Sequence, residues 1–420
     1  MKRLLAAAAL LSTAAAAEDA SLHYQATVAT QYHPGFAAPY SGKNSLQPAA
    51  ESATSVVTDL FGAVRVPWTG SELYLQPELS GGRGLSSTLG VAAFPSGEVY
   101  RVGNPEPTVV VGRAFLRQII GLGGGRSKVD SGPNQLAGER DKDVLVITLG
   151  KFAVPDVFDI VPQSNDPHTR FMSWGLFASA AYDYPADTRG YTYGASADLS
   201  HGDWSARAGI FLEPKVANGQ VLEPDVTAAR GLVAEVERRF SCGAIRLLGF
   251  FNVADMGSYA QATGGRVDIS ATRATGRSKG GLAASANCDF GRGLSGFIRG
   301  SFNDGQNETW AFTEIDRSLA VGAVQSGARW GRPLDEAGLA LVVSGLSAAH
   351  RAYLAGGGFG FLIGDGALDY APEVLGELYY RIAFDERVSF GVNYQPILNP
   401  GYNHARGPVN VLTARAHIAF

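Results

Sequence analysis

Charged side chains recur in segments of this chain where polar and apolar residues alternate, and these charges are the first candidates for chemistry. The basic members are arginines: Arg65, Arg113, Arg117, Arg207, Arg299, Arg381 and Arg415. The acidic members are Asp59, Glu235, Glu237 and Glu377. A guanidinium is planar and can bind two oxygens at once, whereas a carboxylate accepts hydrogen bonds. Walls carrying both kinds of group suit neutral polyols, because hydroxyl groups donate as well as accept.

A second group of polar residues lies in the stretch GKFAVPDVFDIVPQSNDPHTRFMSW, residues 150–174. This stretch places Asp156 and Asp159 on either side of Phe158. An aromatic ring can contact the C–H faces of a sugar while charged groups bind its hydroxyls. We expect the stretch to fold into a pore and narrow it, because irregular backbone at membrane depth is tolerated where it lines a water-filled cavity.

Spacings typical of catalytic or metal sites are missing from the sequence. The seven histidines show no metal-ligand spacing, and there is no GxSxG motif. The glycine run GLGGGR at 121–126 lacks the GK[ST] ending of a phosphate loop. A formal net charge of −4 indicates neither a nucleic-acid partner nor a polybasic membrane patch. We therefore expect no enzymatic activity, no cofactor, no metal and no nucleic acid.

Alternation with period two, typical of strands with one apolar face, extends along the whole chain. The composition is rich in glycine, with 53 residues, and in aromatic residues, but it has only two cysteines. The pattern predicts sixteen strands, at about 22–32, 55–66, 71–80, 108–118, 143–152, 190–200, 203–213, 229–240, 243–253, 278–290, 293–303, 319–330, 338–347, 372–384, 387–396 and 409–420.

Short and long connections alternate between these strands, which is typical of a transmembrane antiparallel β-barrel with tight periplasmic turns and long outer loops. The alternative is a soluble β-sandwich or propeller, but such a fold keeps its outward face polar. We interpret 170–184 as a short helix or packed segment in the third outer loop. The connection 119–142 is long for a periplasmic turn, and the sequence offers no reason for it.

A lumen of sixteen strands is wide enough for water. Any single inward charge could simply pair across this lumen and keep it wet. As a set, the charges favour a path for a solute.

Residues 1–17 are expected to be a secretory signal peptide, because Lys2 and Arg3 precede an apolar run that ends in small residues. The apolar run is too short to span a bilayer. Residues 18–420 then form a single barrel domain, exported through the periplasm to a bacterial outer membrane.

Two further features concern assembly. Cys242 and Cys288 are both expected at the periplasmic rim, where a disulfide is plausible; two unpaired, lipid-facing cysteines are the equal alternative. The last residue, Phe420, ends a strand whose apolar set faces lipid. This residue resembles the C-terminal aromatic by which barrel assembly machinery recognises its clients.

The chain resembles the carbohydrate-selective outer-membrane porins of the OprB type. The resemblance rests on PYSGKNSL (39–46), GRAFLRQIIGLGGG (112–125), NQLAG (134–138), GKF with DPHTRFMSWGL (150–176), AAYDYPADTRGYTYGA (180–195) and NYQPILNPGYN (393–403). It implies a sixteen-stranded porin for passive sugar diffusion, with arginine-rich walls and an inward third loop. Better-known members carry a TGDWGG-like motif before the first strand, which is lacking here, so substrate preference is not carried over.

Sugars, as mono- or oligosaccharides, are thus the expected solutes, and outer-membrane lipid surrounds the barrel. A general or anion-preferring porin is the main alternative, because arginines attract anions. A role in polysaccharide export is another, and a barrel lipase is disfavoured because no Ser–His pair lies on the lipid-facing rim. The sugar, the direction of flux and a homotrimeric state stay open.

Overall fold

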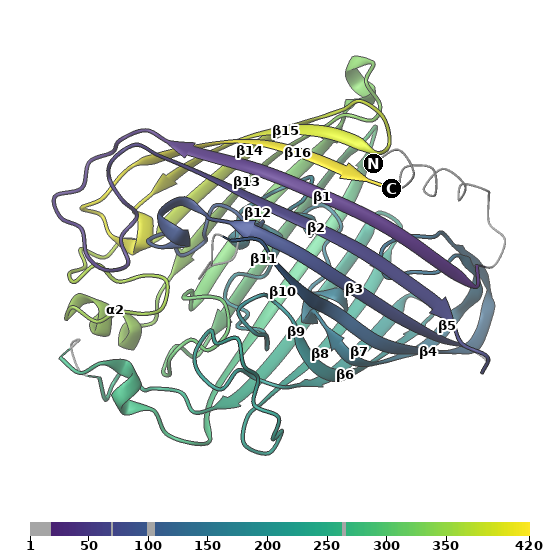
Figure 1. Ribbon diagram of the computed structural model, residues 1–420, viewed down its shortest axis with the longest axis horizontal. Helices are drawn as coiled ribbons and strands as arrows, with labels where there is room; N and C mark the ends of the chain where they lie inside the picture. Colours follow the sequence, from purple (N-terminus) through teal and green to yellow (C-terminus); the bar gives the residue numbers. More distant parts are fainter. Residues whose placement is uncertain (1–17, 69, 99–105, 263–265) are drawn as a thin grey trace.

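Sixteen antiparallel strands close into one barrel, as predicted (Figure 1). The computed structural model describes residues 18–68, 70–98, 106–262 and 266–420, so the expected signal peptide at 1–17 lies outside the described residues. The strands are β1 (Ala20–His33), β2 (Glu51–Arg65), β3 (Ser71–Gly82), β4 (Thr108–Val129), β5 (Gly138–Phe152), β6 (Thr192–His201), β7 (Trp204–Phe211), β8 (Arg230–Phe240), β9 (Gly243–Ala254), β10 (Arg277–Gly291), β11 (Leu294–Asn303), β12 (Arg317–Ser326), β13 (Glu336–Gly345), β14 (Glu373–Ala383), β15 (Val388–Leu398) and β16 (Val409–Ala419).

The barrel is closed by pairing of the first and last strands. The β1–β16 ladder runs from Gln25 opposite Ala419 to Tyr32 opposite Leu412. Phe420 continues this seam, because its N–H donates to Tyr24 O at 2.8 Å and its carbonyl accepts from Tyr24 N at 3.0 Å. No strand edge is therefore left open between the two ends of the sheet.

Outward positions on the strands are apolar, which suits a lipid surrounding. Leu149, Leu339 and Leu412 each expose more than half of their surface on the outer face. Their sequence neighbours point inward and are buried or half-buried, so the period-two pattern places two different environments on the two faces.

Helices are short and lie in the connections. The longest is α2 (Ala348–Ala355), in the loop after β13, and α1 (Trp174–Phe177) lies between β5 and β6. The predicted interpretation of 170–184 as a short helix or packed segment is confirmed. Within the described residues, no helix is long and apolar enough to cross a membrane.

The hairpin of β4 and β5 differs from the prediction of a long turn at 119–142. The two strands pair as far as Val129 and Gly138, with ladder shifts at Gly121, Gly123 and Arg126. Most of the expected connection is therefore strand. The three glycines at 123–125 all have positive φ, between 73° and 93°, a backbone conformation that other residues rarely adopt.

The barrel interior is partly filled by an aromatic core. Inward rings from β7, β9 and β14 contact rings of the segment 153–191, which connects β5 to β6. The pairs are Phe211 with Phe158, Phe250 with Tyr182, and Tyr379 with Phe171, with ring centroids 4.9–6.1 Å apart. On this side of the barrel loop residues cover the wall, and the predicted arginine lining of the lumen is not confirmed there.

Candidate solute passage

The segment 153–191 is bonded to strands from opposite sides of the barrel and therefore lies in its interior. One anchor is an ion pair between Arg299 on β11 and Asp159, with Nη1 and Oδ2 2.7 Å apart. Arg299 exposes only 1% of its surface, so the pair is shielded from water. Asp159 Oδ1 and Oδ2 also accept hydrogen bonds from the hydroxyl and N–H of Ser179.

This anchor continues onto two further strands. The backbone N–H of Asp159 donates to Glu235 Oε2 on β8 at 2.8 Å. Arg207 on β7 donates to the other oxygen of the same carboxylate. Four residues predicted to contact solute, namely Asp159, Arg207, Glu235 and Arg299, thus form one buried network that holds the segment against the wall.

A second anchor lies on β14. The buried carboxylate of Glu377 accepts hydrogen bonds from the backbone N–H groups of Met172 and Ser173, at 2.8 and 3.0 Å. Asn393 and Gln395 on β15 donate to the same carboxylate. A buried carboxylate with four donors is well compensated, so Glu377 fixes the path of the backbone before α1.

A cavity of about 420 Å³ remains between the segment and the wall formed by β1–β4. Polar side chains from the wall and the segment form a connected set along it. Arg113 on β4 binds both oxygens of Asp156, at 2.6 and 2.7 Å, and also donates to Gln76 on β3. Gln76 and Gln25 in turn donate to Asp59 on β2. The remaining charged lining residues are Glu78, Glu98, His168 and Arg189.

Aromatic rings also line this cavity. Trp174 stacks between Phe94 and Phe312, with centroids 5.3 and 5.2 Å away. Phe177 lies edge-on to Trp174 and is the half-buried ring of this cluster. The cavity therefore presents apolar rings as well as hydrogen-bonding groups.

His168 carries a positive charge in this cavity at neutral pH. Burial alone would lower its pKa, but the carboxylate of Glu98, 2.9 Å from Nδ1, raises the pKa of His168 from 6.5 to about 9. The ion pair therefore contributes its full stability below about pH 6.5, and this contribution is lost as the pH rises through about 9.

We expect the ion selectivity of the channel to follow this titration. Between pH 7 and pH 10, roughly one positive charge leaves the cavity, so its preference for cations rises. Reversal potentials in a KCl gradient measure the change. His168→Gln has no titrating side chain at this position, so its cation preference is expected to be nearly independent of pH over this range. An equal change in wild type and variant would contradict the assignment of the titrating charge to His168.

Of the residues predicted to face a solute, Asp59, Arg113 and Asp156 line the cavity. Phe158 is a fully buried residue of the segment, and Glu377 on β14 is fully buried beneath it. Arg65 and Arg117 face inward near the β4–β5 hairpin, and Arg381 lies opposite Glu336 in the β13–β14 ladder. Parity in the strands predicts which residues face inward, but it cannot indicate which of them the loop covers.

The missed lining residues are of two kinds. Gln76 and Glu78 are polar residues at inward positions of β3, so the alternation pattern contained a signal for them. Phe94 and Glu98 lie in the connection between β3 and β4, where no periodicity exists. Their positions depend on the folded path of the loop.

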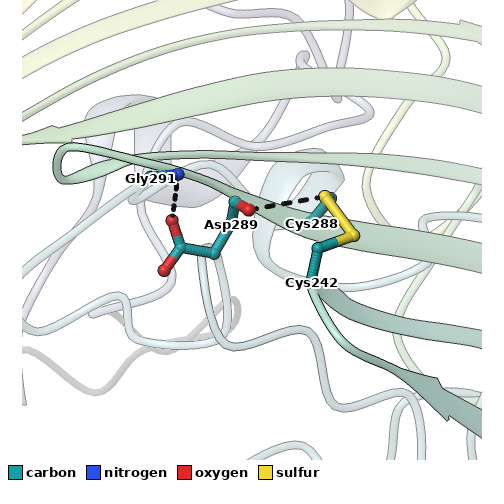
Figure 2. The surroundings of a disulfide bond; sticks show 4 residues. All are labelled: Cys242, Cys288, Asp289 and Gly291. Carbon is teal, nitrogen blue, oxygen red and sulfur yellow. Dashed lines mark hydrogen bonds between the residues drawn. A yellow bond between two sulfur atoms is a disulfide. The ribbon is translucent and has the colours of Figure 1, made fainter.

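The two cysteines form a disulfide in the structure, with Cα atoms 4.8 Å apart (Figure 2). Cys242 lies in the β8–β9 turn and Cys288 near the end of β10. The N–H of Asp289 donates to Cys242 O at 2.6 Å, and Asp289 Oδ1 accepts from Gly291 N at 2.8 Å. The bridge thus joins two neighbouring turns at the end of the barrel where β1 starts.

We expect purified protein to contain this bridge. The intact mass under non-reducing conditions should be about 2 Da below that of the reduced chain, because closing one disulfide removes two hydrogens. Cys242→Ser provides the control in which no such difference remains. Two alkylatable thiols in the unreduced, denatured protein would contradict the bridge.

Comparisons with known proteins agree with this architecture. A model of the carbohydrate-selective porin family, OprB, matches residues 43–420. A search of curated proteins finds no match. The high-pH structure of Pseudomonas putida OprB is similar with a TM-score of 0.72 at 16% identity, covering 96% of this chain and 94% of that one. An anion-selective porin from Comamonas acidovorans has a TM-score of 0.53 at 11% identity, covering 96% and 99%. At these identities the structural likeness concerns the fold.

Proposed function

The chain belongs to the carbohydrate-selective porin family, OprB, and we propose that sugars cross it through the cavity between β1–β4 and the segment 153–191. The protein is an outer-membrane carbohydrate porin, a channel rather than an enzyme. The observation that supports this path is that one cavity is lined both by the half-buried ring of Phe177 and by the connected polar set of Arg113, Asp156, Gln76 and Asp59.

This arrangement fits a neutral polyhydroxylated solute. A sugar offers C–H groups to the aromatic edge and hydroxyls that can both donate to carboxylates and accept from the guanidinium. Because the polar groups are already paired with one another, a hydroxyl can exchange with an existing hydrogen bond at small net cost. Such weak, multiple contacts suit passive diffusion, since the solute must leave as readily as it enters.

An anion-preferring channel is the competing proposal. The cavity has three basic side chains, Arg113, His168 and Arg189, against four carboxylates, Asp59, Glu78, Glu98 and Asp156. Ionised, these groups leave a slightly negative cavity, which favours neutral solutes over anions.

We expect Phe177→Ala to weaken the interaction with sugar. Removing an aromatic contact of about 1 kcal/mol lowers the affinity of the site for a disaccharide by about fivefold. Block of single-channel current by a graded series of sugars measures this affinity.

Phe302→Ala serves as the matched control, because Phe302 is a phenylalanine on the lipid-facing side of β11 with 51% exposure. Equal affinities in the Phe177 variant and wild type would place the sugar elsewhere in the barrel. Block by phosphate without block by any sugar would instead support the anion-preferring alternative.

We further propose how the protein is exported and assembled in the outer membrane. Residues 1–17 would direct export through the periplasm and be removed, leaving 18–420 as the barrel domain. The C-terminal strand would be recognised by the barrel assembly machinery. A homotrimer is a further proposal, and chemical cross-linking in native membranes tests it.

A further inference from the structure

The hairpin formed by β4 and β5 reaches beyond the neighbouring strands at the end of the barrel where β1 starts (Figure 1). Two residues join β6 to β7 at this end, and two join β8 to β9, whereas the β12–β13 connection at 327–335 is about as long as the tip of this hairpin. The hairpin bends at the glycine run 123–125. Asp141 braces this bend, because its carboxylate accepts from Gly123 N at 2.8 Å and from Arg126 Nη1 at 3.1 Å.

The tip of this hairpin, residues 130–137, is tied to the inner rim of the barrel. Arg117 donates to Asn134 O at 2.7 Å, and Arg65 donates to Ala137 O at 3.2 Å. Glu18 exchanges two hydrogen bonds with Ala137, at 3.2 and 3.1 Å. His23 on β1 lies 3.0 Å from the hydroxyl of Ser131. The contacts come from β1, β2 and β4, so the tip is fixed at several points.

The same tip borders the cavity proposed for sugars. Pro133 and Asn134 are part of the cavity lining, next to Gln25 and Phe61 from the wall. Asn134 has φ of +57°, which turns the chain sharply at this point. Within the tip, Leu136 and Ala137 are buried. A solute leaving the cavity on the periplasmic side therefore meets the hairpin tip.

We propose that the tip of the β4–β5 hairpin is the inner selectivity rim of the channel, and that it limits the size of the sugar that passes. Arg65 and Arg117 are positioning residues in this arrangement, because they hold the tip rather than contact the solute. The inference rests on the proposed sugar path and adds to it a second narrow point, built from a periplasmic hairpin instead of an outer loop.

The test uses the full-length protein in liposomes and compares swelling rates for a monosaccharide, a disaccharide and a trisaccharide. In the double variant Arg65→Gln/Arg117→Gln, the carbonyl oxygens of Asn134 and Ala137 lose their guanidinium donors. Losing one such hydrogen bond changes the equilibrium between the bound and the released position of the tip by about fivefold. We therefore expect the ratio of the disaccharide to the monosaccharide swelling rate to rise by about fivefold or more.

Asn134→Gly removes only the lining side chain, because glycine accepts the positive φ without strain. It is expected to raise the same ratio by a smaller amount, and it decides the question if the double variant does not assemble. Lys128→Gln on the same hairpin is the control, since Lys128 is exposed and lies outside the Asp141 contacts that brace the bend. Its ratio should equal that of wild type.

An unchanged ratio in Asn134→Gly, and in the double variant where it assembles, overturns the proposal. The same series with uncharged polyethylene glycols of graded size separates this outcome from a failure of the sugar function. If wild type passes sugars no faster than amino acids of matched size, the sugar path fails. The size limit for glycols then still reports on the hairpin.

Discussion

Replacing Asp159 with alanine is expected to release the segment 153–191 from Arg299 on β11, while the backbone contact with Glu235 on β8 is kept, and to make the channel wider and less stable. The change leaves the Arg299 guanidinium, 1% exposed, without its carboxylate. Removing one partner of such a buried pair costs about 3–5 kcal/mol. It also removes the acceptor of two hydrogen bonds from Ser179. We expect a larger and noisier single-channel conductance and a lower temperature of the mobility shift that reports barrel unfolding on gels.

Two further variants make this expectation specific. Asp156→Ala changes an exposed carboxylate three residues earlier in the same segment, so it should alter sugar block while leaving the unfolding temperature near that of wild type. Asp159→Leu/Arg299→Met removes both charges together and should recover much of the lost stability, because no uncompensated charge remains. If Asp159→Ala unfolds at the wild-type temperature with wild-type conductance, the ion pair does not anchor the segment.

Replacing Phe420 with aspartate is expected to impair assembly far more than transport. Phe420 exchanges two main-chain hydrogen bonds with Tyr24 across the seam, its ring lies 6.5 Å from that of Tyr24, and the Arg387 guanidinium lies 5.7 Å from the Phe420 ring. A carboxylate at this lipid-facing rim cannot form the ring contacts. Losing contacts of about 1–2 kcal/mol at the closing strand pair lowers the level of assembled barrel by about tenfold.

Immunoblots of outer-membrane fractions measure this level, and single-channel recordings measure the conductance of the barrels that do assemble. Phe384→Asp is the matched control. Phe384 follows β14 near the same rim and is 69% exposed, but it does not belong to the seam. Equal losses in both variants would mean that any charge at the rim is harmful, and normal levels of Phe420→Asp would remove the assembly role.

The strands were predictable because their chemistry has a simple period. Leu412, Thr413 and Ala414 alternate between lipid and interior, and the same alternation marks every strand. The exception is the β4–β5 hairpin, where the prediction ended at 118 and resumed at 143. Three consecutive glycines carry no side chains, so a period of two cannot be seen there, and charged residues follow in a part that extends beyond the membrane.

The path of the solute was less predictable, for a different physical reason. The sequence correctly indicates that Arg299 and Arg113 both face inward. It does not indicate that Asp159 pairs with Arg299 and covers it, while Arg113 remains beside the cavity. That difference is decided by contacts between residues 140 positions apart in the chain, such as Arg299 with Asp159. Local patterns contain no information about such pairs.

The aromatic core between the segment 153–191 and strands β7–β14 fills one side of the barrel, so the channel lies off the barrel axis, beside β1–β4. A solute touches β1–β4 and connecting segments, chiefly 153–191, while the rest of the barrel serves as a scaffold. The two halves of the channel wall can therefore vary independently. Transplanting the segment from a relative, with its partners at positions 235, 299 and 377 retained, should transfer its solute preference without rebuilding the barrel.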